Sequence, residues 1–197
     1  MGRSICQRVL LGGACVVASC MAWGQQTGPE KQEPARFEVG FTYDSVLANL
    51  TTGNEFWMQG GSMQIQARLW HGLGVVADVG GLHTANVNDS GTELDLITTT
   101  FGPRYTWSPL PRRFAFFGQV LAGEAHGMNS TFPSGAVFDS SGNSLALQIG
   151  GGINLPLTRH FSARALEANW LRTQLSNATT NVQNNLCLGA GIVYQLK

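Results

Sequence analysis

From Arg36 onward, apolar and polar residues alternate along a succession of short segments. The clearest case is SMQIQARLWHGLGVVADVG, residues 62–80, where the alternation breaks only at Trp70-His71-Gly72 and then resumes. A period of two places successive side chains on opposite faces of a β-strand. The sequence therefore predicts strands joined by tight turns, without a convincing helix, and the two faces of each strand meet different surroundings.

Eight segments of this kind follow one another. They lie at residues 36–45, 62–70, 73–80, 94–107, 114–126, 144–155, 161–172 and 185–196. Each is close to the length of about 9–11 residues that a tilted strand needs to cross a bilayer. In the seventh segment the alternation changes phase near Leu166, which predicts a β-bulge there.

The predicted connections differ in length between the two ends of the strands. Those after the second, fourth and sixth segments are short, at residues 70–72, 108–113 and 156–160. Those after the first, third, fifth and seventh are longer and polar, at residues 47–56, 85–92, 127–143 and 173–184. This arrangement is typical of an all-β, eight-stranded, up-and-down antiparallel transmembrane barrel, and single-chain outer-membrane barrels have an even number of strands.

Charge content favours the polar face as the inner one. Charged residues make up 12% of the chain, whereas a soluble domain carries about 25%. The polar face is mostly Gly, Ala, Thr, Gln and Asn, which suit the crowded interior of a narrow barrel. A secreted soluble barrel with a ligand inside is the alternative. Because an unpaired buried charge is costly, the six charges assigned to the interior are expected to pair: Glu38, Asp78, Glu167, Arg68, Arg104 and Arg164.

The apolar face carries aromatic residues beside the short turns. Amphipathic rings prefer the boundary between lipid and water, so these residues are expected to form a girdle there: Phe37, Trp70, Trp107, Phe114, Phe161 and Tyr194. Backbone groups in lipid must all be paired, and a closed barrel pairs them without an edge. The sequence thus predicts that the apolar face meets outer-membrane lipid, and that the protein resides in the bacterial outer membrane.

The N-terminal residues are expected to lie outside this fold. Residues 1–24 predict a cleaved secretory signal peptide, with Arg3 and Arg8 before an apolar run. A lipidated Cys20 in place of cleavage before Gln25 is the alternative. Residues 25–35 predict a flexible leader, which leaves residues 36–197 as the barrel domain.

Composition also excludes some classes of partner and site. The formal net charge is zero, without the basic surplus that would indicate nucleic acid. After cleavage only Cys187 would remain, so neither an internal disulfide nor a zinc site built from cysteines is expected. The histidines are too scattered for a metal triad, and no cofactor is expected.

The eight segments and the final strand, LCLGAGIVYQLK, resemble the small outer-membrane β-barrels typified by the OmpA transmembrane domain. The resemblance covers residues 36–197. It implies insertion through periplasmic chaperones and the barrel assembly machinery, which would read a C-terminal signal that contains Gly191, Tyr194 and Leu196. Such signals commonly end in phenylalanine, and Lys197 departs from that pattern.

Eight strands enclose an interior just wide enough for side chains, so a general diffusion pore is not expected. The sequence instead predicts a non-enzymatic protein with a structural or surface-interaction role, carried by its long loops, whose ligand the sequence does not identify. In the third long loop, Phe132, Pro133, Val137 and Phe138 form either a contact patch or an apolar group folded onto the barrel rim.

A lipid hydrolase on the same barrel is the rival hypothesis. Such an enzyme needs a serine within hydrogen-bond reach of a histidine, with an acid orienting that histidine. The candidates are His126, Ser130 and either Glu124 or Asp139. The chain has no His-x-Ser pairing like that of lipid A deacylases, and we expect no catalytic residues.

Overall fold

The computed structural model describes residues 36–51, 54–87, 92–110, 114–134, 137–177 and 181–196. All of them belong to one compact unit, Pro34–Lys197. The predicted signal peptide, the flexible leader and Cys20 lie outside the described residues. Within these ranges, no helix is long and apolar enough to cross a membrane.

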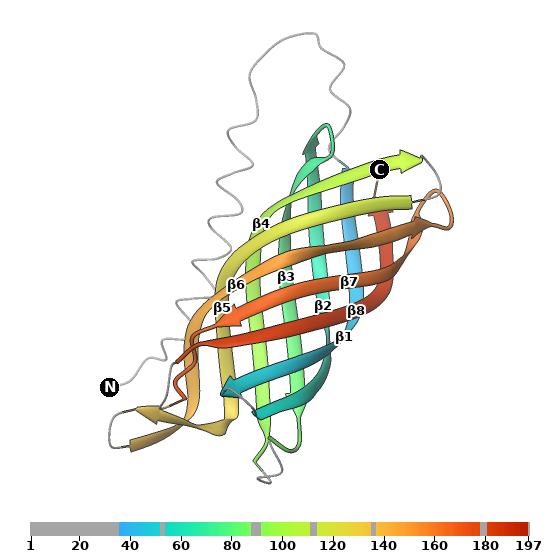
Figure 1. Ribbon diagram of the computed structural model, residues 1–197. Helices are drawn as coiled ribbons and strands as arrows, with labels where there is room; N and C mark the ends of the chain where they lie inside the picture. The colour runs from blue at the N-terminus through green and yellow to red at the C-terminus, as the bar shows by residue number, and fades with distance from the viewer. Residues whose placement is uncertain are drawn as a thin grey trace, which may run out of the picture. The chain divides into compact units, whose positions relative to one another are not determined.

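The described residues form a closed barrel of eight strands (Figure 1). Each strand pairs antiparallel with the next along the chain, and β8 closes the barrel against β1. The predicted all-β, eight-stranded, up-and-down architecture is therefore confirmed. The strands are β1 (Arg36–Thr51), β2 (Asn54–Trp70), β3 (Leu73–Thr84), β4 (Leu94–Leu110), β5 (Phe114–Ser134), β6 (Val137–Pro156), β7 (Phe161–Thr173) and β8 (Gln183–Leu196).

Two of the predicted long loops are largely strand, and the prediction was wrong there. The β1–β2 ladder continues through Asn49↔Glu55 and reaches Thr51↔Asn54. The β5–β6 ladder resumes after a register shift and ends at Ser134↔Val137. Alternation marks a strand only where its two faces meet different media. Backbone pairing, by contrast, continues beyond the membrane-facing part of the strands, and inward residues there, such as Ala48, Phe56 and Phe132, are buried in the end of the barrel.

The tight turn and the bulge follow the sequence closely. Trp70 pairs with Leu73, and the two residues between them have positive φ, 38° at His71 and 90° at Gly72. Two consecutive positive φ values characterise the turns that match the twist of a hairpin. A Cβ on Gly72 would also collide with the carbonyl oxygen of Thr106. The predicted bulge near Leu166 is confirmed by a register shift between Arg164 and Glu167.

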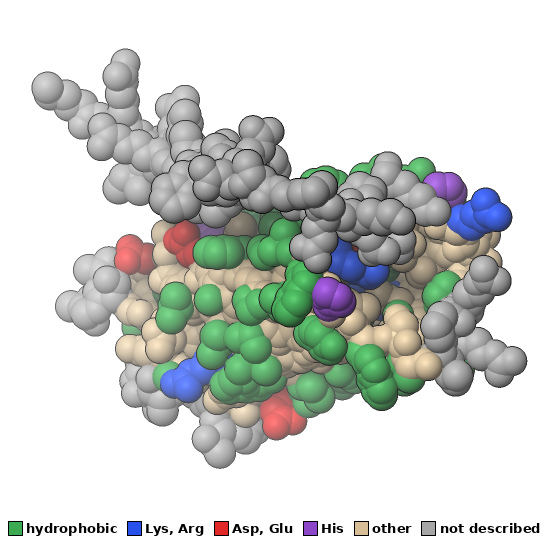
Figure 2. All heavy atoms as spheres, turned by 90° about the horizontal axis from the view of Figure 1, so that it is seen from above, with side chains coloured by type: hydrophobic (Ala, Val, Ile, Leu, Met, Phe, Trp, Pro, Cys, Tyr) green, Lys and Arg blue, Asp and Glu red, His purple; other side chains and the backbone are tan. Residues whose placement is uncertain are grey.

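The apolar face of the barrel is the outer one. In β3, for example, side chains alternate between exposed and buried along the whole strand. Figure 2 shows apolar side chains spread along the visible wall, with few charged ones among them. The observed arrangement is therefore not that of a soluble barrel, whose outer face would be solvated. It matches a wall that faces lipid.

Polar residues mark where this apolar belt ends on the long-loop side. In β3 the belt runs from Leu73 to Gly81 and is followed by His83. At about 3.3 Å per residue along a strand tilted by about 40°, it is about 20 Å tall. The first outward polar residues beyond the belt are Ser45, Gln59, His83, Asp95, Glu124, Asn143, Arg172 and Asn184.

Candidate functional site

The barrel interior is filled by two layers of side chains with different chemistry. The half beside the short turns holds charged and amide side chains: Glu38, Thr42, Gln64, Gln66, Arg68, Arg104, Gln119, Asn154, Arg164, Glu167 and Asn169. We call these residues the polar layer. The half beside the long loops holds the apolar layer: Val46, Ala48, Phe56, Met58, Leu82, Val87, Leu94, Leu96, Ala125, Phe132, Ala146, Leu171 and Leu175.

Glu167 is the centre of the polar layer. One of its oxygens lies 2.6 Å from Nη1 of Arg164. The other accepts hydrogen bonds of 2.9 Å from the amides of Gln64, Gln119 and Asn169. Side chains from three strands, β2, β5 and β7, thus converge on one buried carboxylate. A buried charge is tolerated when it is paired and its remaining lone pairs are satisfied, as here.

Arg104 is buried but does not pair with an acid, and the expected ion pair was wrong. Its guanidinium donates to the side-chain oxygens of three glutamines, Gln119 at 2.9 Å, Gln66 at 3.1 Å and Gln64 at 2.5 Å. No salt bridge joins Arg104 to Asp78 among the described residues. The side-chain amides at inward positions of β2 and β5 thus accept the hydrogen bonds that Arg104 was expected to donate to a carboxylate.

Phe117 is an aromatic side chain within the polar layer. Its ring centre lies 4.3 Å from the Cζ atom of Arg104 and 4.9 Å from that of Arg164. A guanidinium beside an aromatic face gains electrostatic attraction, and more so away from water. Gly152 leaves room for this ring, because a Cβ there would lie 2.8 Å from it. Sequence alternation did place Phe117 inward, but nothing in the sequence linked it to the arginines.

Glu38 and Arg68 form the second interior ion pair, nearer the short-turn end. Arg68 Nη2 lies 2.8 Å from Glu38 Oε1, which also accepts a 3.3 Å hydrogen bond from Gln195. Glu38 is buried and Arg68 is partly exposed. Solvent at this end of the barrel screens the pair more than the one between Arg164 and Glu167.

Two interior carboxylates lie apart from these pairs. Asp78 is buried, and its Oδ2 atom has no hydrogen-bond partner among the described residues. Asp44 also faces inward, between the positions of Thr42 and Val46 on β1. The sequence placed Asp44 on the polar face, but the predicted charge set omitted it. The described interior side chains therefore include four carboxylates and three guanidinium groups.

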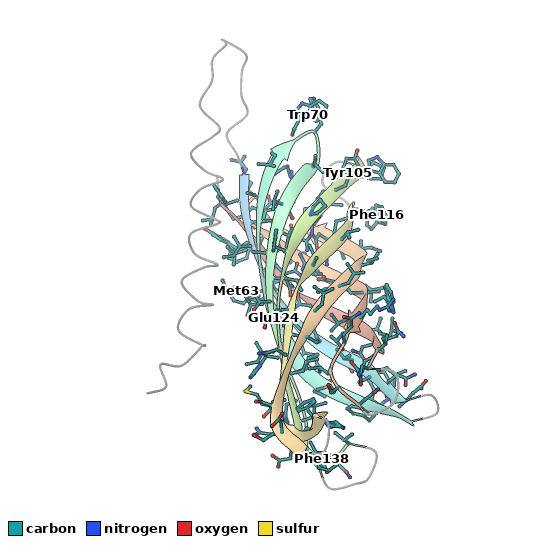
Figure 3. The ribbon with its side chains drawn as sticks, turned by 90° about the vertical axis from the view of Figure 1, so that its left-hand side faces the viewer. Met63, Trp70, Tyr105, Phe116, Glu124 and Phe138 are labelled. Carbon is teal, nitrogen blue, oxygen red and sulfur yellow. The ribbon has the colours of Figure 1, made fainter. Side chains whose placement is uncertain are left out.

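The predicted patch of the third long loop divides between the inside and the outside. Phe132 is buried in the apolar layer and lies over Gly127 and Gly142. Phe138 is 71% exposed, and Figure 3 shows it at the opposite end of the barrel from Trp70. The side chain of Val137 lies outside the described residues. Phe132 thus packs inside the rim of the barrel, as one of the two alternatives predicted, whereas the side chain of Phe138 is exposed on the outside.

The histidines at the long-loop end have amide and acid partners. His126 Nδ1 contacts Asn143 Oδ1. His83 Nδ1 lies 2.6 Å from Asp95 Oδ1, and Asn129 donates to the other oxygen of Asp95 at 2.5 Å. In the described part of the chain, no serine, threonine or cysteine side chain is hydrogen-bonded to a histidine ring. In these residues His126 therefore contacts Asn143 and not Ser130, the serine named in the hydrolase hypothesis.

Metal ligation by clustered residues is not seen either. Across the described ranges, no group of three or more His, Cys, Asp or Glu side chains is placed to hold a metal ion. Cys187, the one cysteine in these ranges, is free, and its side chain adjoins the apolar layer.

The six predicted girdle residues all face outward and are at least 38% exposed. Phe161 and Tyr194 pack against each other, with ring centres 5.0 Å apart. Two more outward aromatics, Tyr105 and Phe116, lie toward the same end as Trp70 (Figure 3). The prediction omitted them, although both lie two residues from girdle positions on their strands and share the outward phase.

The predicted assembly signal lies on the strand that closes the barrel. Gly191 and Leu196 of β8 are opposite Thr42 and Phe37 of β1, and the Tyr194 and Leu196 side chains face outward. A Cβ on Gly191 would collide with the carbonyl oxygen of Phe41. The glycine of this signal is thus also required for close strand pairing.

Comparisons with known proteins agree with this architecture. No family model matches the chain, and no curated protein matches it. Among solved structures, Neisserial surface protein A is 14% identical with a TM-score of 0.61, over 80% of this chain and 96% of its own. Ail of Yersinia pestis, in complex with the heparin analogue sucrose octasulfate, is 15% identical with a TM-score of 0.54, over 82% and 99%. This chain therefore has the fold of small eight-stranded outer-membrane barrels.

Proposed function

We propose that the protein is an integral outer-membrane barrel that acts as an anchor, with its working surface on the long-loop side. The filled interior supports this proposal most directly. Both layers consist of buried side chains packed across the barrel, so the interior offers no wide aqueous path. An interaction function must then lie on the surfaces outside the membrane, where loops carry recognition in most folds.

Charge is distributed unequally between the two ends. Residues 47–56, 85–93, 127–143 and 173–184, which are the long connections together with the adjoining Glu93, contain no lysine or arginine. They contain four acids, Glu55, Asp89, Glu93 and Asp139. The short turns, by contrast, carry Arg112, Arg113 and Arg159. The outward Arg172 lies at the edge of this end. A surface on which acids outnumber cations attracts a partner that presents positive charge.

This charge pattern indicates a partner of a different chemical class from the ligand bound by a protein of similar fold. The Ail structure contains a heparin analogue, sucrose octasulfate, and a polysulfated ligand requires cationic side chains. The long connections of this chain offer none. We therefore assign a basic polypeptide, and not a sulfated polysaccharide, as the class of partner.

Binding to a defined polycation tests this assignment. The full chain, in nanodiscs of zwitterionic phosphatidylcholine, should bind poly-L-lysine, and not heparin, above the level of empty nanodiscs. Added salt should weaken the binding, because attraction between exposed charges is screened beyond about 8 Å at physiological ionic strength. The triple variant Glu55→Gln, Glu93→Gln and Asp139→Asn should bind less.

Arg159→Gln is the matched control, since it changes the charge at the short-turn end. It should leave poly-L-lysine binding unchanged. Heparin binding by the wild type, or equal poly-L-lysine binding by the triple variant, would overturn the acidic-surface assignment.

The location itself has a direct test. Outer-membrane fractions from cells that express the full-length chain should contain the protein. It should also change electrophoretic mobility in SDS on boiling, because a barrel that resists SDS migrates differently from the unfolded chain. A soluble periplasmic protein without this shift would contradict membrane insertion.

The proposed C-terminal assembly signal can be separated from barrel stability. Tyr194 and Tyr43 are both outward tyrosines, on β8 and β1 respectively. We expect Tyr194→Ala to slow insertion by the assembly machinery and to leave the protein with periplasmic chaperones, whereas Tyr43→Ala should insert at the wild-type rate. Equal insertion of the two variants, followed by pulse-chase in cells, would contradict the signal.

A further inference from the structure

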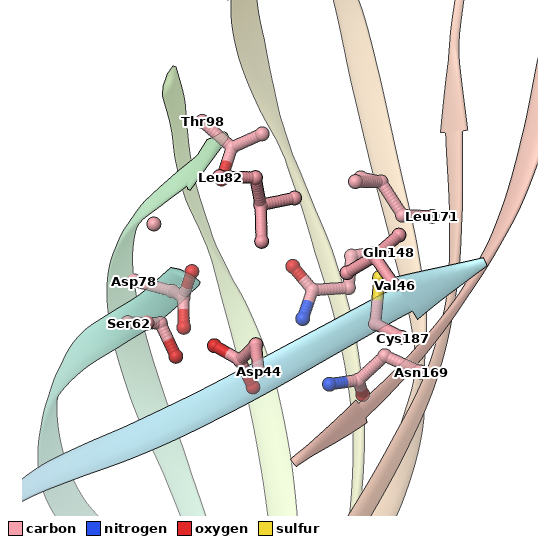
Figure 4. Close-up of a pocket in the computed structure, with 12 residues that line it drawn as sticks. Asp44, Val46, Ser62, Asp78, Leu82, Thr98, Gln148, Asn169, Leu171 and Cys187 are labelled. Carbon is pink, nitrogen blue, oxygen red and sulfur yellow. The ribbon is translucent and has the colours of Figure 1, made fainter. Parts of the chain in front are cut away.

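A small cavity lies inside the barrel between the polar layer and the apolar layer (Figure 4). Its volume is about 30 Å³. A cavity that admits a water molecule needs about 10–15 Å³, so this one has room for one or two particles of that size. Oxygen-bearing side chains directed into it are Asp44, Ser62, Asp78, Thr98, Gln148 and Asn169.

Glycines opposite Asp44 create this space. Asp44 is paired with Gly60 on β2 and with Gly189 on β8, so neither cross-strand neighbour fills the barrel beside its carboxylate. A Cβ on Gly189 would collide with Asp44 Oδ1. On β3, a Cβ on Gly80 would lie 2.8 Å from the hydroxyl oxygen of Thr98. Glycines thus leave room for polar atoms at this height in the barrel, where larger side chains would fill the interior.

Among the described interior side chains, carboxylates outnumber guanidinium groups by one. Arg164 is bound to Glu167 and Arg68 to Glu38, while Arg104 is bound to glutamine oxygens. Among the side chains that the structure describes, these are the three interior guanidinium groups, and the interior carboxylates number four. Within the described ranges, Asp44 and Asp78 have no ion-pair partner.

The carboxylate of Asp78 lies at the cavity and has one oxygen atom without a hydrogen-bond partner among the described residues. The residue is only 3% exposed, and Oδ2 is buried without a hydrogen-bond partner. A buried carboxylate oxygen that is left unpaired is costly. Its side chain points into the cavity together with that of Asp44 (Figure 4). Both acids therefore converge on the same small volume inside the barrel.

We propose that this cavity binds one small monovalent cation such as Na⁺, held between the carboxylates of β1 and β3. The donors are all hard oxygens, from carboxylates, hydroxyls and side-chain amides, which suit hard cations and not soft transition metals. One positive charge balances the one excess carboxylate. The volume admits a largely dehydrated alkali ion and excludes an organic cation of the size of choline.

The bound cation joins strands that are not neighbours in the barrel. Asp44 lies on β1 and Asp78 on β3, with β2 between them. Ligand binding to the folded state alone stabilises it in proportion to the logarithm of ligand concentration. The cation is thus a structural component that links the polar layer to the apolar layer.

Thermal unfolding in two salts tests the site. The folded full chain in a neutral detergent is dialysed at pH 8 into choline chloride or into NaCl at equal ionic strength, and its midpoint is followed by tryptophan fluorescence. We expect the midpoint in NaCl to be higher by about 2–4 °C, the shift that about 1 kcal/mol of binding gives in a chain of this size. The midpoint should rise with the logarithm of the NaCl concentration as NaCl replaces choline chloride.

Asp78→Asn and Asp44→Asn, which keep the side-chain shape, should each abolish the difference between the salts. Glu124→Gln is the control, because it removes an exposed carboxylate on the outer wall. It should keep the full difference.

Equal wild-type midpoints in both salts would overturn the proposal, and would leave water or a shared proton as the content of the cavity. A salt difference that survives in the aspartate variants would overturn it as well. If one variant does not fold, the other variant and the dependence of the wild-type midpoint on NaCl concentration still decide.

Discussion

The short-turn half of the barrel interior is filled by charged and amide side chains, whereas the long-loop half is filled by aliphatic and aromatic ones. The two halves use the same backbone ladder and the same alternation of side chains. They differ in how each interior side chain is stabilised. In the polar layer, each group depends on a particular partner at a particular distance. In the apolar layer, each depends on contact with any neighbour of suitable volume.

This difference implies that the two layers respond unequally to substitution. Removal of one partner from a buried ion pair leaves the other charge buried without compensation. The free energy of unfolding then falls by the full cost of that unpaired charge. Removal of an apolar side chain leaves a cavity, whose cost falls when neighbours relax into it. The polar layer therefore sets the geometry of the barrel, and the apolar layer closes the outer end with more tolerance.

The largest expected effect is at the centre of the polar layer. Glu167→Leu leaves the guanidinium of Arg164 buried without its carboxylate, and three amide donors lose their acceptor. We expect a loss of about 4 kcal/mol in the free energy of unfolding. Guanidinium unfolding in detergent, followed by tryptophan fluorescence, measures it.

A double variant separates pairing from packing. Glu167→Leu combined with Arg164→Met removes both charges, so its loss should be smaller than the sum of the two single losses. Additive losses would show that the ion pair is not the source of the effect.

Phe132 and Phe138 provide the matching test of the apolar layer. Phe132→Ala empties a buried ring position, with an expected loss of about 3 kcal/mol. Phe138→Ala removes an exposed ring of the same size from the same connection, and should change the free energy of unfolding by less than about 0.5 kcal/mol. The same unfolding experiment compares them. Equal losses would place Phe138 inside the rim as well.

Arg104 refines the comparison within the polar layer. Arg104→Met leaves glutamine oxygens without a donor but leaves no acid without a direct partner. We expect a loss of about 2 kcal/mol, smaller than that of Glu167→Leu, because an unsatisfied amide costs less than an unpaired charge. Unfolding of the two variants in parallel checks the order. A loss at Arg104 as large as that at Glu167 would mean that Arg104 compensates a carboxylate at longer range.

The sequence was sufficient for the fold because strand alternation and connection length depend on local pattern. Alternation across residues 62–80 identified a hairpin, and the phase change at Leu166 located a bulge. The ends of β1 and β5 were missed, because apolar and polar residues no longer alternate regularly there, although the backbone stays paired and Ala48 and Phe132 are buried. Pattern therefore predicts the membrane-facing part of each strand better than its full length.

The interior partners were less predictable, for a different reason. Inward phase identifies which side chains share the interior, but neighbours across a barrel come from strands distant in the chain. Glu167 meets Gln64, 103 residues away, and this pairing leaves no local signal. The apolar layer, by contrast, did leave a local signal in the sequence. Inward positions become apolar toward the long loops, as at Met58, Leu82 and Leu96, and this gradient predicts a closed outer end.

The smallest expected effect is on ion conduction through the barrel. Its measurement tests whether either layer alone is enough to block the passage of ions. Phe132→Ala opens the rim of the apolar layer, but the polar layer below it stays packed around Glu167 and Arg104. We therefore expect no rise in conductance above the wild type in planar lipid bilayers. Glu167→Leu is the counterpart, since it loosens the polar layer and leaves the apolar layer in place. If Phe132→Ala conducts and Glu167→Leu does not, the apolar layer alone is the seal, and the polar layer serves only to hold the strands in register.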